Sequence, residues 1–98
     1  MNIKFKDLKN KNVVITGGNG FLGKQLCNAF LNQGSKVFVL DIKKPKSKNK
    51  LIFFKTDITQ EVDLKKFLTF LKQKKIKIDV LINGAAKDYV PTKKNENK

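Results

Sequence analysis

The sequence of 98 residues has no arginine, histidine or tryptophan and contains a single cysteine, Cys27. Because one cysteine cannot form a disulfide framework within the chain, a reducing cytoplasm is the simplest location. Cys27 falls in a predicted helix, and we interpret it as a packed thiol rather than a reactive one. No apolar run approaches the length that spans a membrane, and no apolar signal segment follows residues 1–6. We therefore expect a cytoplasmic protein with no membrane anchor.

All 22 basic residues are lysine, and they give the chain a formal net charge of +14. Such a charge ordinarily indicates a nucleic-acid or other anionic partner. Arginine, however, would be expected where phosphates or base edges are bound by two parallel hydrogen bonds. The phenylalanines lie in apolar runs instead of alternating with lysines as stacking platforms do. A coding bias toward A/T-rich codons explains the lysines at least as well, so we do not expect nucleic acid as a partner.

Four apolar runs predict the strands of a sheet. They comprise residues 13–15, 36–40, 51–54 and 80–82. Each run is continuous rather than alternating, which is typical of parallel strands that are covered on both faces. The sequence therefore predicts an α/β fold with a parallel sheet of about four strands.

Two stretches of helical periodicity predict the main helices. The first covers residues 21–33 and ends at Gly34, which suits the left-handed position after a helix. The second follows Thr59, its predicted N-cap, with acidic residues in its first turn and lysines in its last. The predicted buried positions are Leu22, Leu26, Ala29 and Phe30 in the first helix and Leu64, Phe67, Leu68 and Leu71 in the second.

A glycine-rich turn, Thr-Gly-Gly-Asn-Gly-Phe-Leu-Gly at residues 16–23, connects the first predicted strand to the first predicted helix. Gly17 allows a sharp exit from the strand, Gly20 lets backbone N–H groups approach phosphate oxygens, and Gly23 lets the helix lie close to the strand. The helix N-terminus adds free N–H donors and partial positive charge, an arrangement that suits a dinucleotide's pyrophosphate. The turn residues predicted to bind the cofactor are Gly17, Asn19, Gly20, Phe21, Leu22 and Gly23.

The second predicted strand ends at Asp41. Its distance along the chain from the glycine turn is typical of an acidic side chain that accepts hydrogen bonds from the adenosine ribose hydroxyls. An aspartate can also simply end a strand. Because the glycine turn precedes Asp41 at this spacing, we favour the ribose-binding role for Asp41.

Two short motifs follow the third and fourth predicted strands. Residues 56–59 read Thr-Asp-Ile-Thr, and residues 83–86 read Asn-Gly-Ala-Ala. Together with the glycine turn and Asp41, they resemble the short-chain dehydrogenase/reductase family over residues 8–86. The resemblance implies a partial Rossmann-type, doubly wound sheet that binds NAD(P). It also implies that Asp57 lies near the adenine amino group, Ile58 against the adenine ring, and Asn83, Gly84, Ala85 and Ala86 along the ribose.

The glycine spacing leaves the branch of the family open. Gly17, Gly20 and Gly23 match the extended branch, which includes nucleotide-sugar epimerases and dehydratases. The Asp-Ile-Thr motif and the turn after the fourth strand look more like the single-domain reductases. The resemblance therefore implies an NAD(P)-dependent oxidoreductase, with a nucleotide-sugar epimerase or dehydratase fragment as the alternative.

The length accommodates only the first half of a doubly wound fold and one further strand. The resemblance places the family's catalytic Ser and Tyr-x-x-x-Lys on later elements. Tyr89 and Lys93 spell that motif, but Pro91 between them would break the helix that must align the two side chains. We therefore predict no catalytic residue and no metal site here. We expect a truncated or split gene product, with a separately encoded C-terminal half as its partner, or a non-catalytic nucleotide-binding module.

The domain and cofactor predictions follow from the same features. Residues 1–90 are predicted to form an incomplete dinucleotide-binding domain, and residues 91–98 a disordered polar tail. The lysine-rich connection at residues 42–50 contains a proline and is predicted to be mobile. Asp41 would repel a 2′-phosphate, so we predict NAD as the cofactor, with NADP as an alternative because lysines follow directly.

Overall fold

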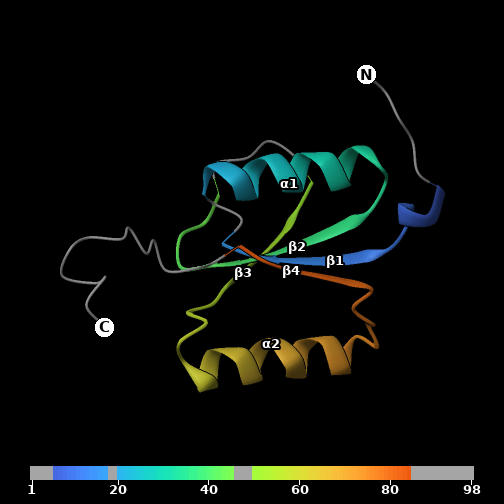
Figure 1. Ribbon diagram of the computed structural model, residues 1–98. Coiled ribbons are helices and arrows are strands. Elements are labelled where there is room, and N and C mark those ends of the chain that lie inside the picture. The colour runs from blue at the N-terminus through green and yellow to red at the C-terminus, as the bar shows by residue number, and fades with distance from the viewer. Residues whose placement is uncertain (1–5, 18–19, 46–49, 85–98) are drawn as a thin grey trace, which may run out of the picture.

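The computed structural model describes residues 6–17, 20–45 and 50–84, in which a sheet lies between two helices (Figure 1). Helix α1 covers one face of the sheet and helix α2 the other. In chain order the elements are a 3-10 helix at Lys6–Leu8, β1 at Asn12–Thr16, α1 at Phe21–Asn32, β2 at Lys36–Asp41, β3 at Ile52–Lys55, α2 at Glu61–Gln73 and β4 at Val80–Asn83.

The strands pair in the order β3-β2-β1-β4, and every pairing is parallel. Thr16 at the end of β1 lies opposite Leu40 of β2 and Asn83 of β4. The carboxyl ends of these strands therefore meet at one end of the sheet, where open α/β sheets bind their ligands. The predicted parallel α/β fold is confirmed.

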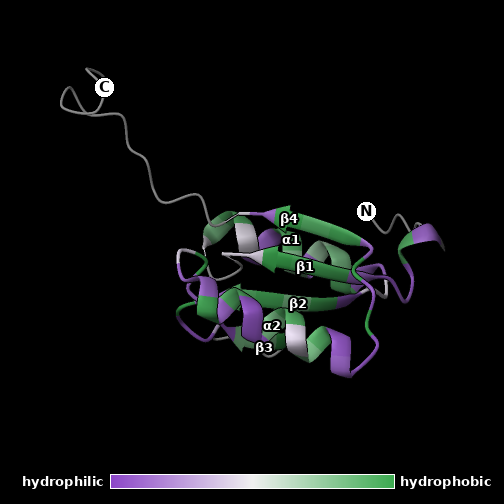
Figure 2. Cartoon of the chain, turned by 90° about the horizontal axis from the view of Figure 1, so that it is seen from below, coloured by the Kyte–Doolittle hydropathy of each residue, from purple (hydrophilic) through white to green (hydrophobic). Residues whose placement is uncertain are grey.

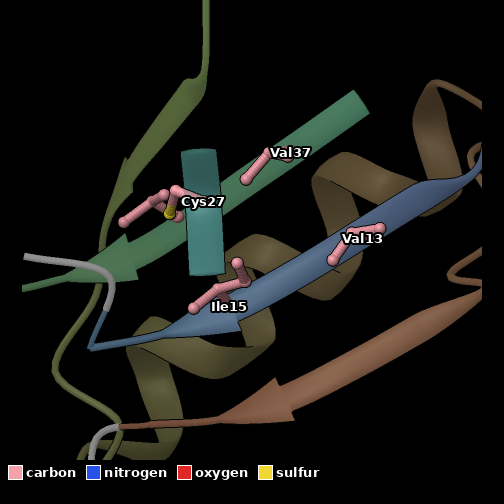
Figure 3. Packing of buried hydrophobic residues seen from close by; sticks show 5 residues of the cluster. Val13, Ile15, Cys27 and Val37 are labelled. Atoms are coloured by element: carbon pink, nitrogen blue, oxygen red, sulfur yellow. The ribbon is translucent and has the colours of Figure 1, made fainter. Parts of the chain in front are cut away.

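Side chains of β1, β2 and α1 fill the space under α1. Val13 and Ile15 of β1 and Val37 of β2 pack against Cys27 of α1, and all four are buried (Figure 3). Burial raises the pKa of the Cys27 thiol, which disfavours the reactive thiolate. The interpretation of Cys27 as a packed thiol is confirmed.

A cluster rich in aromatic rings fills the space under α2. The ring of Phe67 on α2 contacts Phe38 and Phe54 edge to face, at centroid distances of 6.5 and 5.3 Å. Such geometry places the positive edge of one ring against the negative face of another. The buried members of this cluster are Val14, Phe38, Leu40, Phe67 and Leu71.

Three of the predicted buried helix positions were wrong. Leu22 and Leu68 are 66% and 57% exposed, and Ala29 is also exposed. Helix α1 instead buries Gly23 and Cys27, whose small side chains let its backbone approach the β-branched strands. The buried arc of α1 is thus centred on its small residues, and Leu26 and Phe30 pack beside them half-buried. The other predicted positions are buried or half-buried.

The left-handed position predicted after the first helix is confirmed, but the N-cap predicted for the second helix is wrong. Gly34 follows α1 with φ +81°, as expected for the left-handed position after a helix. Thr59 was wrongly predicted as the N-cap of α2, which is Gln60 and has no side-chain capping bond. The Thr59 hydroxyl and N–H both donate to Asp57 Oδ1 instead, so an Asx-type turn before the helix competes with the cap.

The remaining predictions about chain organisation concern the connection after β2 and the C-terminal tail. Residues 42–45 and residue 50 contain no helix or strand. Residues 46–49 and the predicted tail at 91–98 lie outside the described residues, as does the boundary proposed at residue 90. Within the described ranges, no helix is both long enough and apolar enough to cross a membrane.

Candidate functional site

The first strand leaves the sheet through a turn that only glycine adopts easily. Gly17 has φ +70°, in the left-handed region that side chains disfavour. Its N–H donates to the carbonyl of Leu40 at 2.8 Å, which extends the β1–β2 pairing by one bond beyond β1. Gly17 therefore turns the chain sharply at the carboxyl end of the sheet, as the sequence predicted.

Gly20 begins helix α1 and has a different reason to be glycine. Its backbone is extended, with φ −74° and ψ 169°, and its carbonyl accepts the first helical bond from Lys24 N–H at 2.9 Å. A Cβ added there would meet, among the described residues, only the carbonyl oxygen of Gly17, at an ordinary 3.6 Å. The described part of the fold thus tolerates a side chain at Gly20. Among the described residues, nothing closer occupies the space in front of Gly20.

In the described part of the chain, no side chain offsets the positive end of the α1 dipole. Among the described residues, no side chain caps the helix, and no acidic residue lies in its first turn. The first N–H groups of a helix have no partner within the helix and attract anions. Phe21 and Leu22, the first two residues of α1, are largely exposed, whereas the next residue, Gly23, is buried. Asn19 lies outside the described residues.

Asp41 ends β2 with its carboxylate held by the following backbone. Its Oδ1 accepts hydrogen bonds from the N–H groups of Ile42 at 2.6 Å and of Lys43 at 3.5 Å. The side chain is half-exposed. These bonds orient the carboxylate at the carboxyl end of the sheet.

Asp57 follows β3 and is oriented by two bonds from Thr59. Oδ1 of Asp57 accepts from the Thr59 hydroxyl at 2.6 Å and from the Thr59 N–H at 2.9 Å. These two bonds, the hydroxyl first, lower the pKa of Asp57. Its own N–H donates to Asp63 Oδ2 at 2.9 Å. Among the described residues, Oδ2 of Asp57 receives no hydrogen bond, so a fixed, charged acceptor remains available to a ligand.

A cavity of about 350 Å³ lies at the ends of β1, β2 and β3. This volume is within the range of small-molecule sites. The cavity brings together four residues that the sequence predicted from three separate segments, namely Gly17, Asp41, Asp57 and Ile58. Sequence reasoning missed the other lining residues, although each adjoins a predicted one. They are Leu40, Ile42, Thr56 and Thr59.

Asn83, the last residue of β4, and Gly84 contact the end of β1 and are not among the residues that line the cavity. The Thr16 hydroxyl donates to Asn83 Oδ1 at 2.8 Å, and Gly84 N–H donates to the Thr16 carbonyl at 3.0 Å. A Cβ on Gly84 would lie 2.9 Å from that carbonyl oxygen, so the chain approaches β1 too closely for a side chain. Ala85 and Ala86 lie outside the described residues.

Thr16 is a further residue that the site prediction missed. It is 8% exposed, and its hydroxyl joins β1 to β4. The signal was present in the sequence, because Thr16 is the first residue of the glycine-rich turn at residues 16–23. Its pairing with Asn83 becomes evident only from the strand register.

Comparison with known proteins yields a consistent set of relatives. A family model described as short chain dehydrogenase matches residues 11–98. A short chain dehydrogenase/reductase of Gibberella zeae is 35% identical over 88 residues, which cover 81% of this chain and 33% of that protein. Alcohol dehydrogenase 1 of Ceratitis cosyra is 37% identical over 86 residues, covering 76% of this chain and 34% of its own. The chain thus spans about a third of these relatives.

Solved structures agree with these relatives. A short chain dehydrogenase from Leptospira borgpetersenii with bound NAD+ superposes with a TM-score of 0.72 at 31% identity, over 76% of this chain and 31% of that one. The ligand-free aldohexose dehydrogenase of Thermoplasma acidophilum gives 0.76 at 26% identity, over 92% of this chain and 37% of that one. These relatives are dehydrogenases and do not favour the epimerase or dehydratase alternative. The chain belongs to the short-chain dehydrogenase family, with the parallel α/β fold of its N-terminal part.

Proposed function

We propose that this chain is the cofactor-binding part of an NAD(P)-dependent oxidoreductase and binds the dinucleotide across the carboxyl ends of its strands. The observation that carries the proposal is the cavity where Gly17, Asp41, Asp57 and Ile58 come together. The backbone groups and carboxylates there suit a nucleoside, and the adjoining helix N-terminus suits a phosphate.

The adenosine occupies this cavity. The carboxylate of Asp41 accepts hydrogen bonds from the ribose hydroxyls, as the oriented Oδ1 and half-exposed side chain allow. Oδ2 of Asp57 has no donor among the described residues and accepts from the adenine amino group. Ile58 packs against the adenine ring. The Asp57 carboxylate is charged at neutral pH, and its lowered pKa extends that charge to more acidic pH.

The pyrophosphate lies over the glycine turn and the start of α1. The open space in front of Gly20 and the uncapped helix end support this placement. The turn residues assigned to it are Gly17, Asn19, Gly20, Phe21, Leu22 and Gly23.

The second ribose follows the turn after β4. Asn83, Gly84, Ala85 and Ala86 are assigned to it, and the bond between Thr16 and Asn83 supports the position of their first residue. When bound, the nicotinamide of such a cofactor exchanges a hydride with the substrate. The groups that would transfer the proton are expected in the part of the relatives beyond the matched third, so this chain alone binds the cofactor without turnover.

NAD is the preferred cofactor in this proposal. A 2′-phosphate would lie at hydrogen-bond range from the Asp41 carboxylate and would be repelled. Lys43 and Lys44 follow directly, but both are exposed, and their attraction is screened by salt and opposed by side-chain entropy. The short-range repulsion between Asp41 and a 2′-phosphate therefore outweighs the attraction of the two lysines, and NAD is preferred over NADP.

Calorimetric titration of the folded chain with NAD and with ADP-ribose tests the proposal. We expect both to bind with similar affinity, since the adenosine and pyrophosphate supply most of the proposed contacts. Binding of neither ligand by folded protein would contradict it.

A further inference from the structure

Helix α2 is anchored to the two strands that lead into the nucleotide cavity. Figure 2 shows α2 in front of β2 and β3. The ring of Phe67 contacts Phe38 of β2 and Phe54 of β3. The ring centroid of Phe70 lies 5.1 Å from that of Phe54. A helix packed in this way is a rigid support for the residues of its first turn.

Asp63, in the first turn of α2, reaches back to the chain that enters the helix. Its Oδ2 accepts a hydrogen bond from the backbone N–H of Asp57 at 2.9 Å. A carboxylate three positions after the N-cap often accepts from the N-cap N–H. Here the N-cap is Gln60, and its N–H donates to the carbonyl of Asp57 at 2.9 Å instead. The Asp63 side chain therefore fixes Asp57 and leaves the cap to the backbone.

Asp57 is held at each of its polar groups except one carboxylate oxygen. Asp63 binds its N–H, and Gln60 binds its carbonyl. The hydroxyl and the N–H of Thr59 both bind Oδ1. Among the described residues, Oδ2 receives no hydrogen bond, and Asp57 lines the cavity. One acceptor in a fixed position thus remains at the cavity.

A fixed acceptor distinguishes purines by the group at C6. The 6-amino group of adenine donates a hydrogen bond to such an acceptor. Hypoxanthine carries a carbonyl oxygen at C6 instead, and its proton lies on the neighbouring N1. A carboxylate that is free to turn can follow that proton, whereas a fixed one cannot. A site built around one donor rejects an analogue that lacks it, because the buried partner is left unpaired.

We propose, on the basis of the nucleotide site proposed above, that Asp63 is a positioning residue for Asp57. By binding the Asp57 N–H from the anchored helix, it fixes the remaining Asp57 oxygen and makes the cavity select a 6-amino purine over a 6-oxo purine. Asp63 does not itself line the cavity. Its effect on the ligand therefore passes through Asp57.

Paired calorimetric titrations with NAD and with nicotinamide hypoxanthine dinucleotide test this role, because the two ligands differ only in the purine. Asp63→Ala removes the acceptor of the Asp57 N–H, and Asp63→Asn replaces it with an amide oxygen of the same reach. Glu61→Ala is the matched control, because Glu61 is acidic, lies in the same first turn and pairs with Lys65 at the exposed surface. Buried Cys27 reports folding, since maleimide leaves it unlabelled in folded protein.

We expect the unmutated chain and Glu61→Ala to bind NAD about tenfold more tightly than the hypoxanthine analogue, since one hydrogen bond to a charged acceptor is lost. Asp63→Ala should reduce this ratio to about threefold or less, and Asp63→Asn should restore most of it. An undiminished ratio in folded Asp63→Ala would overturn the proposal, as would an equal fall in Glu61→Ala. Loss of affinity for both ligands by the same factor would indicate a role in stability alone and would also overturn it.

Hydrogen exchange of the Asp57 amide, followed by NMR without any nucleotide, measures the bond to Asp63 directly. We expect faster exchange in Asp63→Ala than in the unmutated chain or in Glu61→Ala, because the N–H loses its acceptor. Unchanged exchange would overturn the proposal whatever the ligands do. Binding of neither dinucleotide by folded protein would contradict the proposed function and the purine selectivity with it. An unchanged ratio in a chain that binds NAD would contradict only the role of Asp63.

Discussion

The hydroxyl of Thr16 donates a hydrogen bond to Oδ1 of Asn83 at 2.8 Å and thereby joins the carboxyl ends of β1 and β4. The strand order reverses between these two strands, because β2 and β3 lie on one side of β1 and β4 on the other. Doubly wound sheets bind nucleotides at such a reversal. The Thr16–Asn83 hydrogen bond therefore holds β1 and β4 together next to the cavity that Asp41 and Asp57 line.

Replacement of Thr16 by valine tests the contribution of this bond. Thr16→Val keeps the shape of the side chain but removes the donor to Asn83, so we expect a loss of about 1 kcal/mol in the free energy of unfolding. Urea unfolding measures it. Thr69→Val is the control, since Thr69 is exposed on α2. Equal stability of the two variants would show that the bond contributes nothing.

Gly84→Ala is expected to destabilise the fold. The added Cβ would lie 2.9 Å from the backbone carbonyl oxygen of Thr16, and backbone cannot move aside cheaply. Overpacking of this kind costs about 1–3 kcal/mol. Gly20→Ala is the matched control, because its Cβ meets only an ordinary 3.6 Å contact. Urea unfolding in which Gly20→Ala loses as much stability as Gly84→Ala would refute this reading of the two glycines.

Gly20→Val is expected to weaken NAD binding about tenfold or more, which corresponds to about 1.4 kcal/mol. The branched side chain would fill the open space where the pyrophosphate approaches α1. Calorimetry on variants checked to be folded measures the affinity, and Gly20→Ala should give a smaller loss. If the folded Gly20→Val variant bound NAD with unchanged affinity, the pyrophosphate would not lie in front of Gly20.

Thr59→Ala is expected to raise the pKa of Asp57 toward its ordinary value, because the Thr59 hydroxyl is the main cause of the lowered value. A lowered carboxyl pKa contributes stability that is present above pH about 4 and lost as pH falls further. The stability difference between native chain and variant should therefore shrink below that pH. NMR titration of the Asp57 side chain measures the pKa, with Thr69→Ala as control. An unchanged pKa in Thr59→Ala would be the contrary result.

Asp41→Ala is expected to narrow or reverse a preference for NAD over NADP, because it removes the charge that repels the 2′-phosphate. Lys43→Ala should leave the preference nearly intact, since Lys43 is exposed and its attraction is screened. Paired affinity measurements at physiological salt compare the two variants. Tighter NADP binding by the unmutated chain would mean that the lysines set the preference.

The strands and the cavity residues at their ends could be predicted from the sequence because each depends on local pattern. Continuous apolar runs mark strands buried on both faces, and Gly17, Asp41 and Asp57 stand directly at strand ends. The buried arc of α1 could not be predicted in the same way. The small residues Gly23 and Cys27 are the ones buried against the sheet. Which helix residues are buried depends on the shape of the sheet surface under α1, and the helix sequence alone does not give that shape.

Contacts between segments far apart in the chain also could not be predicted from the sequence. The pairing of Thr16 with Asn83 depends on strand register, and the bond from Asp57 N–H to Asp63 depends on how the chain enters α2. The same turn geometry moved the N-cap of α2 from Thr59 to Gln60, because the Thr59 hydroxyl already bonds to Asp57.

NMR titration of the isotope-labelled chain with NAD tests the central claim most directly, because each backbone amide reports its own surroundings. The account predicts that the largest shifts fall on amides of residues that line the cavity, such as Gly17, Asp41, Ile42, Asp57, Ile58 and Thr59. Amides at the opposite end of the sheet, such as those of Lys36 and Val80, should stay nearly unchanged. Saturating NAD that leaves the cavity amides unshifted, or that shifts the opposite end more strongly, would contradict it.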